Sequence, residues 1–177
     1  MDLSKFKTSD WLKVGGAAVF LVFGFFDWVT VEYAGFGAGS GGNVFDFFWT
    51  GTIPWILVLG TGILTFLMAA GMMNKGNLPW SLIFLAATGL AALLLLIRVI
   101  FNPLEGKDAV EAIGGSVGRG FGMYLSVIGG LAACAGAVMG FQEEGGSMSD
   151  LTDMNKIKGQ FGGNGGGSTP PPPPPAG

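Results

Sequence analysis

Histidine is absent from this chain, and cysteine occurs once, as Cys134. Without histidine there can be no imidazole-ligated haem or zinc and no nucleophile activated by a histidine base. A single cysteine cannot close a disulfide within the chain or form a dithiol redox centre. The sequence offers no other catalytic or metal-binding pattern, so we expect a protein that is not an enzyme and that holds no cofactor or metal.

Charged residues are scarce as well, at 12% of 177 residues. A typical soluble domain carries about 25%. Half of the residues are hydrophobic, the mean hydropathy is +0.56, and uncharged stretches approach the roughly 20 residues that an α-helix needs to cross a bilayer. The net charge of −3 is small and dispersed, whereas nucleic-acid binding needs a clustered basic face. The composition predicts an integral membrane protein whose first partner is the lipid bilayer, with no nucleic acid.

The uncharged stretches divide the chain into three parts. We expect a cytoplasmic segment at 1–10, a transmembrane domain at 11–141 and a disordered Gly/Pro-rich cytoplasmic tail at 142–177. The predicted fold is all-α, an integral membrane four-helix bundle with a disordered C-terminal tail. Its helices are expected at about 11–29, 53–73, 78–101 and 119–141.

The first apolar stretch has two interpretations. Lys5, Lys7 and Lys13 precede it, as basic residues precede the apolar part of a secretory signal. The stretch then leads into Asp27 and Trp28 with no small-residue cleavage site beside them. We interpret it as an uncleaved membrane helix.

The two longer loops differ in character. Residues 30–52 are rich in glycine and aromatic residues and have no lysine or arginine. We expect them to form a turn on the bilayer surface, because aromatic rings favour the headgroup level. Residues 104–113 are expected to form a short amphipathic helix. Residues 114–120 are glycine-rich but lack the order of a phosphate-binding loop, so we assign no nucleotide site there.

Basic residues predict the orientation, because they stay mainly on the cytoplasmic side of short loops. With both termini in the cytoplasm, six basic residues lie inside and three outside, namely Lys5, Lys7, Lys13, Lys75, Lys156 and Lys158 against Arg98, Lys107 and Arg119. We therefore expect a multi-pass protein of the plasma (inner) membrane with cytoplasmic N- and C-termini.

Two charged residues lie close to the hydrocarbon. Asp27 is near the outer end of the first expected helix and Arg98 is near the outer end of the third, so their side chains are expected at similar depth. They are a candidate intramembrane ion pair. Such a pair either is structural or forms a gate or ion-binding element at an outer mouth, since charges inside a membrane are costly and often functional.

The last expected helix carries a row of small residues, which permit the close backbone approach that drives helix association in lipid. Two roles remain open for this candidate packing face, namely packing within the bundle and association with other copies or other membrane proteins. Its members are Gly122, Ser126, Gly130, Gly136 and Gly140.

The tail combines a possible short helix with a polyproline segment. Leu151, Met154 and Phe161 fall at helical spacing. The prolines adopt an extended helix that aromatic grooves recognise. The tail either docks on a cytoplasmic protein or is an inert extension. Its candidate docking residues are Leu151, Met154, Phe161, Pro170, Pro171, Pro172, Pro173, Pro174 and Pro175.

The plan of four short-looped helices followed by Pro170 to Pro175 resembles that of actinobacterial four-helix antigenic membrane proteins. The resemblance covers the architecture of the whole chain and rests on no motif, so it implies no site residues. It implies a plasma-membrane protein of an envelope or division assembly. Four-helix multidrug exporters have a similar length, but they depend on a glutamate in the middle of the first helix, where this chain has the apolar residues Ala18 to Val22.

Two functions follow from these observations. We expect a non-enzymatic membrane accessory or assembly subunit that associates with other membrane proteins or with itself and presents its tail to a cytoplasmic partner. The alternative is a small oligomeric channel or transporter with Asp27 and Arg98 at its outer mouth. The middle of the expected helices offers hydroxyl groups but no acid that would couple transport to protons or cations.

Overall fold

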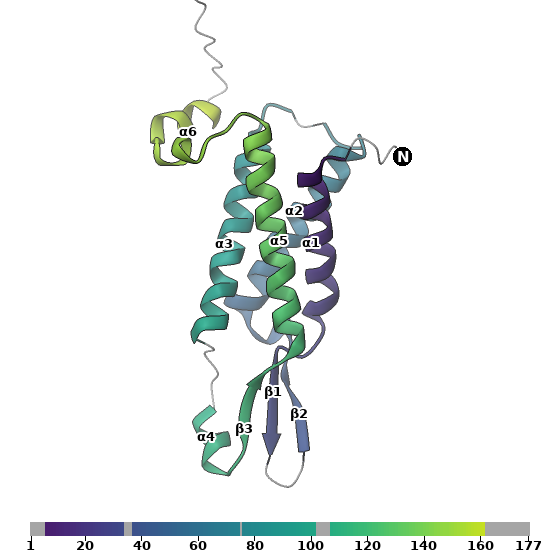
Figure 1. The fold of residues 1–177 in the computed structure, drawn as a ribbon, viewed down its shortest axis with the longest axis vertical. Helices are drawn as coiled ribbons and strands as arrows, with labels where there is room; N and C mark the ends of the chain where they lie inside the picture. Colours follow the sequence, from purple (N-terminus) through teal and green to yellow (C-terminus); the bar gives the residue numbers. More distant parts are fainter. Residues whose placement is uncertain (1–5, 34–36, 75, 102–106, 162–177) are drawn as a thin grey trace, which may run out of the picture.

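The computed structural model of the chain describes residues 6–33, 37–74, 76–101 and 107–161. Four long helices run side by side (Figure 1): α1 (Thr8–Gly24), α2 (Ile53–Ala69), α3 (Trp80–Phe101) and α5 (Phe121–Glu143). α1 packs against α2 and α5, and α3 packs against the same two helices. Three helical stretches are long and apolar enough to cross a membrane, namely Phe48–Ala69, Trp80–Phe101 and Phe121–Glu143. The prediction of a mostly helical membrane protein is confirmed at this level.

The helix boundaries differ from the predicted ones for local reasons. α1 ends at Gly24 and not at residue 29, because the chain turns there and the Trp28 amide already donates to the Gly42 carbonyl at 2.8 Å. The π-helical turn η3 (Phe48–Thr52) leads directly into α2 and places Pro54 in its first turn, where a missing N–H costs no helical hydrogen bond.

α5 runs to Glu143 and ends in a motif that requires glycine. Gly145 has φ +87°, a left-handed conformation that glycine adopts at little cost. The Gly145 amide donates to Gln142 O at 3.0 Å and the Gly146 amide donates to Phe141 O at 3.0 Å. These two bonds form a Schellman motif, which satisfies carbonyl groups left over at the end of a helix.

A three-stranded antiparallel sheet replaces the surface turn that we expected at 30–52. The hairpin β1 (Val29–Tyr33) and β2 (Gly37–Gly42) is joined on its other side by β3 (Ser116–Arg119), in the order β2-β1-β3. A short 3-10 turn η2 (Val44–Asp46) follows β2, and the helix α4 (Lys107–Ala112) precedes β3, within the segment predicted as a surface helix. The all-α prediction was therefore wrong for this region.

The sheet lies at one end of the four long helices (Figure 1). We call this the sheet end. The opposite end, where α1 begins and α5 finishes, we call the terminal end.

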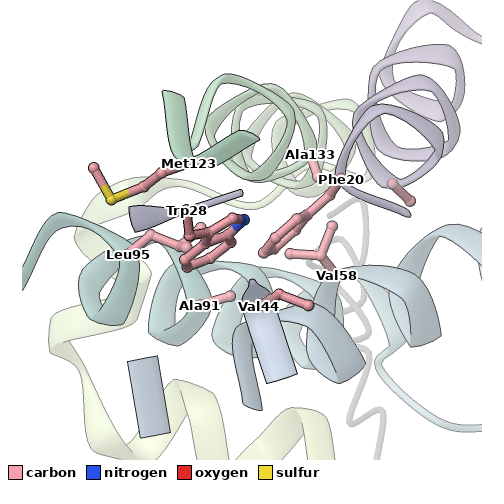
Figure 2. Close-up of a cluster of buried hydrophobic side chains, with 9 residues drawn as sticks. Phe20, Trp28, Val44, Val58, Ala91, Leu95, Met123 and Ala133 are labelled. Atoms are coloured by element: carbon pink, nitrogen blue, oxygen red, sulfur yellow. The ribbon is translucent and has the colours of Figure 1, made fainter. Parts of the chain in front are cut away.

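The core joins the sheet end to the helices. Trp28 is fully buried immediately before β1, and its ring stacks on Phe20 of α1 with a centroid distance of 6.1 Å. Figure 2 shows these two rings side by side among residues from the other helices. The buried cluster consists of Ala17, Phe20, Trp28, Val44, Val58, Ala91, Leu95, Met123 and Ala133.

The outer surface of the helices is apolar too. Every long helix exposes large hydrophobic side chains, among them Val22, Ile63, Leu93 and Ile128. Soluble proteins rarely expose extended apolar patches, whereas helices that are apolar all round suit lipid.

The C-terminal segment contains more regular secondary structure than we predicted. Two short helices, η4 (Met148–Thr152) and α6 (Met154–Phe161), lie within the tail predicted as disordered. They include the short helix that the spacing of Leu151, Met154 and Phe161 indicated, although Leu151 belongs to η4 and the other two begin and end α6. The predictions for Pro170 to Pro175 lie outside the described residues.

Candidate functional site

Arg98 and Asp27 both lie at the sheet end of the long helices. Arg98 of α3 is 1% exposed, and its guanidinium carbon lies 3.7 Å from the centre of the Phe47 ring. Asp27 is exposed in the turn between α1 and β1, and its carbonyl accepts the Gly122 amide at 3.1 Å. Arg98 is therefore buried inside the helical bundle with its guanidinium against the Phe47 ring, while Asp27 is exposed. Their pairing stays a prediction.

The small residues of α5 contact helices of the same chain. A methyl group at Gly136 would lie 2.8 Å from main-chain atoms of Ser9 and Lys13 in α1. A methyl group at Gly122 would lie 2.8 Å from the Phe26 carbonyl oxygen, and one at Gly130 would lie 2.5 Å from the Leu95 side chain. The structure thus brings this face to α1 and α3, which is the first of the two roles considered above.

Two glycines outside the predicted row also bring the main chains of α1 and α5 close together. A methyl group at Gly16 of α1 would lie 2.5 Å from the Gly129 carbonyl oxygen, and one at Gly129 would lie 2.7 Å from the Gly16 carbonyl oxygen. We did not single out either residue in the sequence. The signal available was a glycine pair, Gly15 and Gly16, inside an otherwise apolar helix.

A polar cavity at the terminal end is the feature that sequence reasoning missed. It has a volume of about 240 Å³ and lies between the four long helices. Its charged walls come from the start of α1 and the end of α5, its hydroxyl groups come from α1, α2 and α3, and Phe84 and Trp80 of α3 supply aromatic walls. Its lining residues include Ser9, Asp10, Lys13, Thr65, Phe84 and Glu143.

Lys13 is the most unusual residue of this cavity, because it is only 7% exposed. Its ammonium lies 3.0 Å from Asp10 Oδ1 and 5.6 Å from the centre of the Phe84 ring. A buried charge is tolerated when it is paired and when its other donors find partners. Asp10 supplies the charge partner, and its second oxygen accepts the Lys7 amide at 3.2 Å.

Two contacts tie the start of α1 to the end of α5 beside the cavity. The Ser9 hydroxyl donates to Glu143 Oε2 at 2.8 Å, and the Lys7 ammonium lies 3.6 Å from the same oxygen. We counted Lys7 and Lys13 only as markers of orientation. The spacing of Asp10 and Lys13, three residues apart, is typical of a helical ion pair and was the signal available.

Thr65 of α2 also lines the cavity, and it is 3% exposed. Its hydroxyl has no hydrogen-bond partner among the described residues. By contrast, the buried Thr88 hydroxyl donates to the Phe84 carbonyl at 2.7 Å, the usual solution within a helix. Most buried side-chain polar atoms have a partner. Ser126, Trp28 and Trp55 also bury a polar atom with no partner among the described residues, but of these four residues Thr65 alone lines the cavity.

The C-terminal segment is held by the half-buried carboxylate of Asp150. Asp150 accepts the Ser147 amide at 2.9 Å and the Lys156 ammonium at 2.6 Å, which joins η4 to α6. The hydrogen bond from Lys156 lowers the pKa of Asp150, and the same bond raises the pKa of Lys156. The link is therefore present at neutral pH and is lost as the pH falls through the lowered pKa of Asp150.

The fold and surface define a helical membrane protein with a small sheet at one end and a polar cavity at the other. Comparison of the chain with protein-family models, curated proteins and solved structures found no match.

Proposed function

We propose that the chain is a four-pass protein of the plasma membrane with both termini in the cytoplasm. α1 has 17 residues and is shorter than the three stretches that are clearly long enough to span. Its contacts with α5 nevertheless run from Lys13 beside Gly136 to Phe23 beside Gly122. A helix in contact with a spanning helix over this length lies at the same depth, which supports a fourth crossing.

Within that topology, we infer a non-enzymatic accessory or assembly subunit. The observation that carries this inference is the filled axis of the helical bundle. Phe20, Val58, Ala91, Leu95 and Ala133 are each fully buried there, and this packed core supports a bundle without an aqueous path along the described helices of one copy. A bundle with a packed core and an apolar outer surface is suited to contact other membrane proteins or further copies, and we expect the C-terminal tail to bind a cytoplasmic partner.

A small oligomeric channel or transporter is the second candidate. The fully buried Arg98 favours it, because a charge inside a membrane protein often marks an ion or substrate pathway. Because Arg98 is buried against Phe47 inside the bundle, such a pathway would have to open at the sheet end beside this ring, with Asp27 and Arg98 near its outer mouth.

The two candidate functions predict different sets of proteins that co-purify with the chain. We expect an N-terminally tagged full chain, extracted in native lipid, to carry other membrane proteins and a soluble partner. Deletion of residues 145–177 should keep the membrane proteins and lose the soluble one, and deletion of 162–177 alone separates the contribution of α6 from that of the proline segment. Mass spectrometry of the isolated particles makes the measurement. Particles that contain only copies of this chain, unchanged by either deletion, would contradict the assembly role and favour the channel.

A further inference from the structure

We propose that the cavity at the terminal end binds the headgroup of an aminophospholipid, a phosphate ester that carries a primary ammonium. The phosphate would lie beside Lys13 and Thr65, and the ammonium beside Glu143 at the mouth. This site is independent of which proteins the chain associates with.

Hydrogen-bond donors inside the cavity point to an anionic acceptor. The Lys13 ammonium carries three N–H groups, and one Asp10 oxygen at 3.0 Å accounts for one of them. The Thr65 hydroxyl adds a buried donor that has no partner among the described residues. A phosphate accepts several such bonds at once, and charge-assisted bonds of this kind are about twice as strong as neutral ones.

Charged groups lie at two depths in the cavity. Inside, Lys13 is paired with Asp10 and keeps further N–H groups beside the Thr65 hydroxyl, and these donors suit a phosphate. At the mouth, Glu143 has its side chain 31% exposed and Lys7 lies 3.6 Å from it, while Glu144 also lines the cavity. Two carboxylates therefore face one lysine at the mouth, and this excess of negative charge suits the ammonium of the headgroup.

The same order of charges discriminates among lipids. A glycerol headgroup offers no positive charge to Glu143. A choline headgroup carries a quaternary ammonium that has no N–H to donate. We therefore expect phosphatidylethanolamine to bind better than phosphatidylglycerol or phosphatidylcholine.

The position and size of the cavity favour a lipid as the source of this chemistry. It lies at the end of the apolar helices, beside Trp80, and tryptophan is enriched at the headgroup level of membranes. The volume of about 240 Å³ equals that of about eight water molecules, which accommodates one phosphoethanolamine group.

The test measures thermal unfolding of the purified full chain in detergent. Dioleoyl lipids with ethanolamine, glycerol or choline headgroups are titrated separately, and soluble phosphoethanolamine is titrated in parallel. We expect the ethanolamine lipid to raise the Tm at a concentration at least tenfold lower than the concentrations at which the other two lipids and the soluble compound raise it.

Thr65→Val is the decisive variant. It removes a hydroxyl that has no partner within the described chain, so the lipid-free Tm should stay the same or rise, while the affinity for the ethanolamine lipid should fall about tenfold. Thr61→Val is its matched control, because Thr61 lies one turn away on α2, is equally buried and does not line the cavity. Lys13→Met should also lose the lipid effect, but it leaves Asp10 without its cation and risks misfolding.

Three results would overturn the proposal. The first is an equal effect of all three lipids on the native chain. The second is an unchanged effect of the ethanolamine lipid on Thr65→Val. The third is soluble phosphoethanolamine acting at the same concentration as the lipid, which would assign the cavity to a soluble metabolite.

Discussion

Gly16→Ala should unfold the helical bundle at a much lower denaturant concentration than the native chain, whereas Gly15→Ala should not. The added methyl group at Gly16 would lie 2.5 Å from the Gly129 carbonyl oxygen and 2.6 Å from the Ala133 amide nitrogen. Both atoms belong to the main chain of α5, so no side-chain rotation can relieve the clash and the two helices must separate. Overpacking costs about 1 to 3 kcal/mol, and we expect the upper end of that range.

Gly15 provides a control one residue away on the same helix. No atom lies within 4 Å of a methyl group placed there, and alanine favours a helix over glycine by about 0.5 to 1 kcal/mol. Unfolding by sodium dodecyl sulfate in mixed micelles, followed by tryptophan fluorescence, measures both variants. Equal stability of the two would mean that α1 and α5 do not approach as closely as described.

Arg98→Gln should also cost the protein much of its stability. The substitution removes a fully buried guanidinium from the face of the Phe47 ring, a contact worth up to about 2 kcal/mol when desolvated, together with the packing of the side chain. Asp27→Asn should cost about 0.5 to 1 kcal/mol, because Asp27 is exposed. Arg119→Gln is the control at the same end, since Arg119 is exposed and its guanidinium donates to the Val99 carbonyl at 2.7 Å.

The double variant Asp27→Asn with Arg98→Gln completes a thermodynamic cycle, measured in the same micelle assay. If the two side chains interact, the losses of the single variants should fail to add by at least about 0.5 kcal/mol. Additive losses would show that the predicted pair does not form, and they would remove the main support for a gate at the outer mouth.

The long helices could be predicted because each has its own signal, an uncharged apolar stretch of nearly membrane-spanning length. The sheet could not, because none of its strands is recognisable alone. β2 has the sequence Gly-Ala-Gly-Ser-Gly-Gly, and glycine is depleted in strands. β1 pairs with β3 through Val29 with Arg119 and Val31 with Val117, although α2, α3 and α4 lie between them in the sequence. Pairing at that separation depends on the bundle having brought the two loops together.

The candidate site, like the fold, could be predicted from the sequence only in part. The positions of Arg98 and the glycine row could be predicted, since charge and residue size are visible in the sequence. That the glycines face α1, and that Lys13 is buried, depends on the antiparallel packing of α1 on α5, which places Ser9 and Lys7 beside Glu143. Nothing in the sequence around Lys13 alone contains that information.

The most direct test of the account is the membrane topology, because every inference about partners and lipids depends on which side each end faces. In a Cys134→Ala background, single cysteines at Thr8, Ser147 and Ser116 sample the start of α1, the segment after α5 and the sheet; all three positions are exposed. Four crossings predict that a membrane-impermeant maleimide labels Ser116→Cys on intact cells and labels Thr8→Cys and Ser147→Cys only after the membrane is permeabilised. Labelling of Thr8→Cys together with Ser116→Cys on intact cells would mean that α1 does not cross, and it would contradict the four-pass bundle.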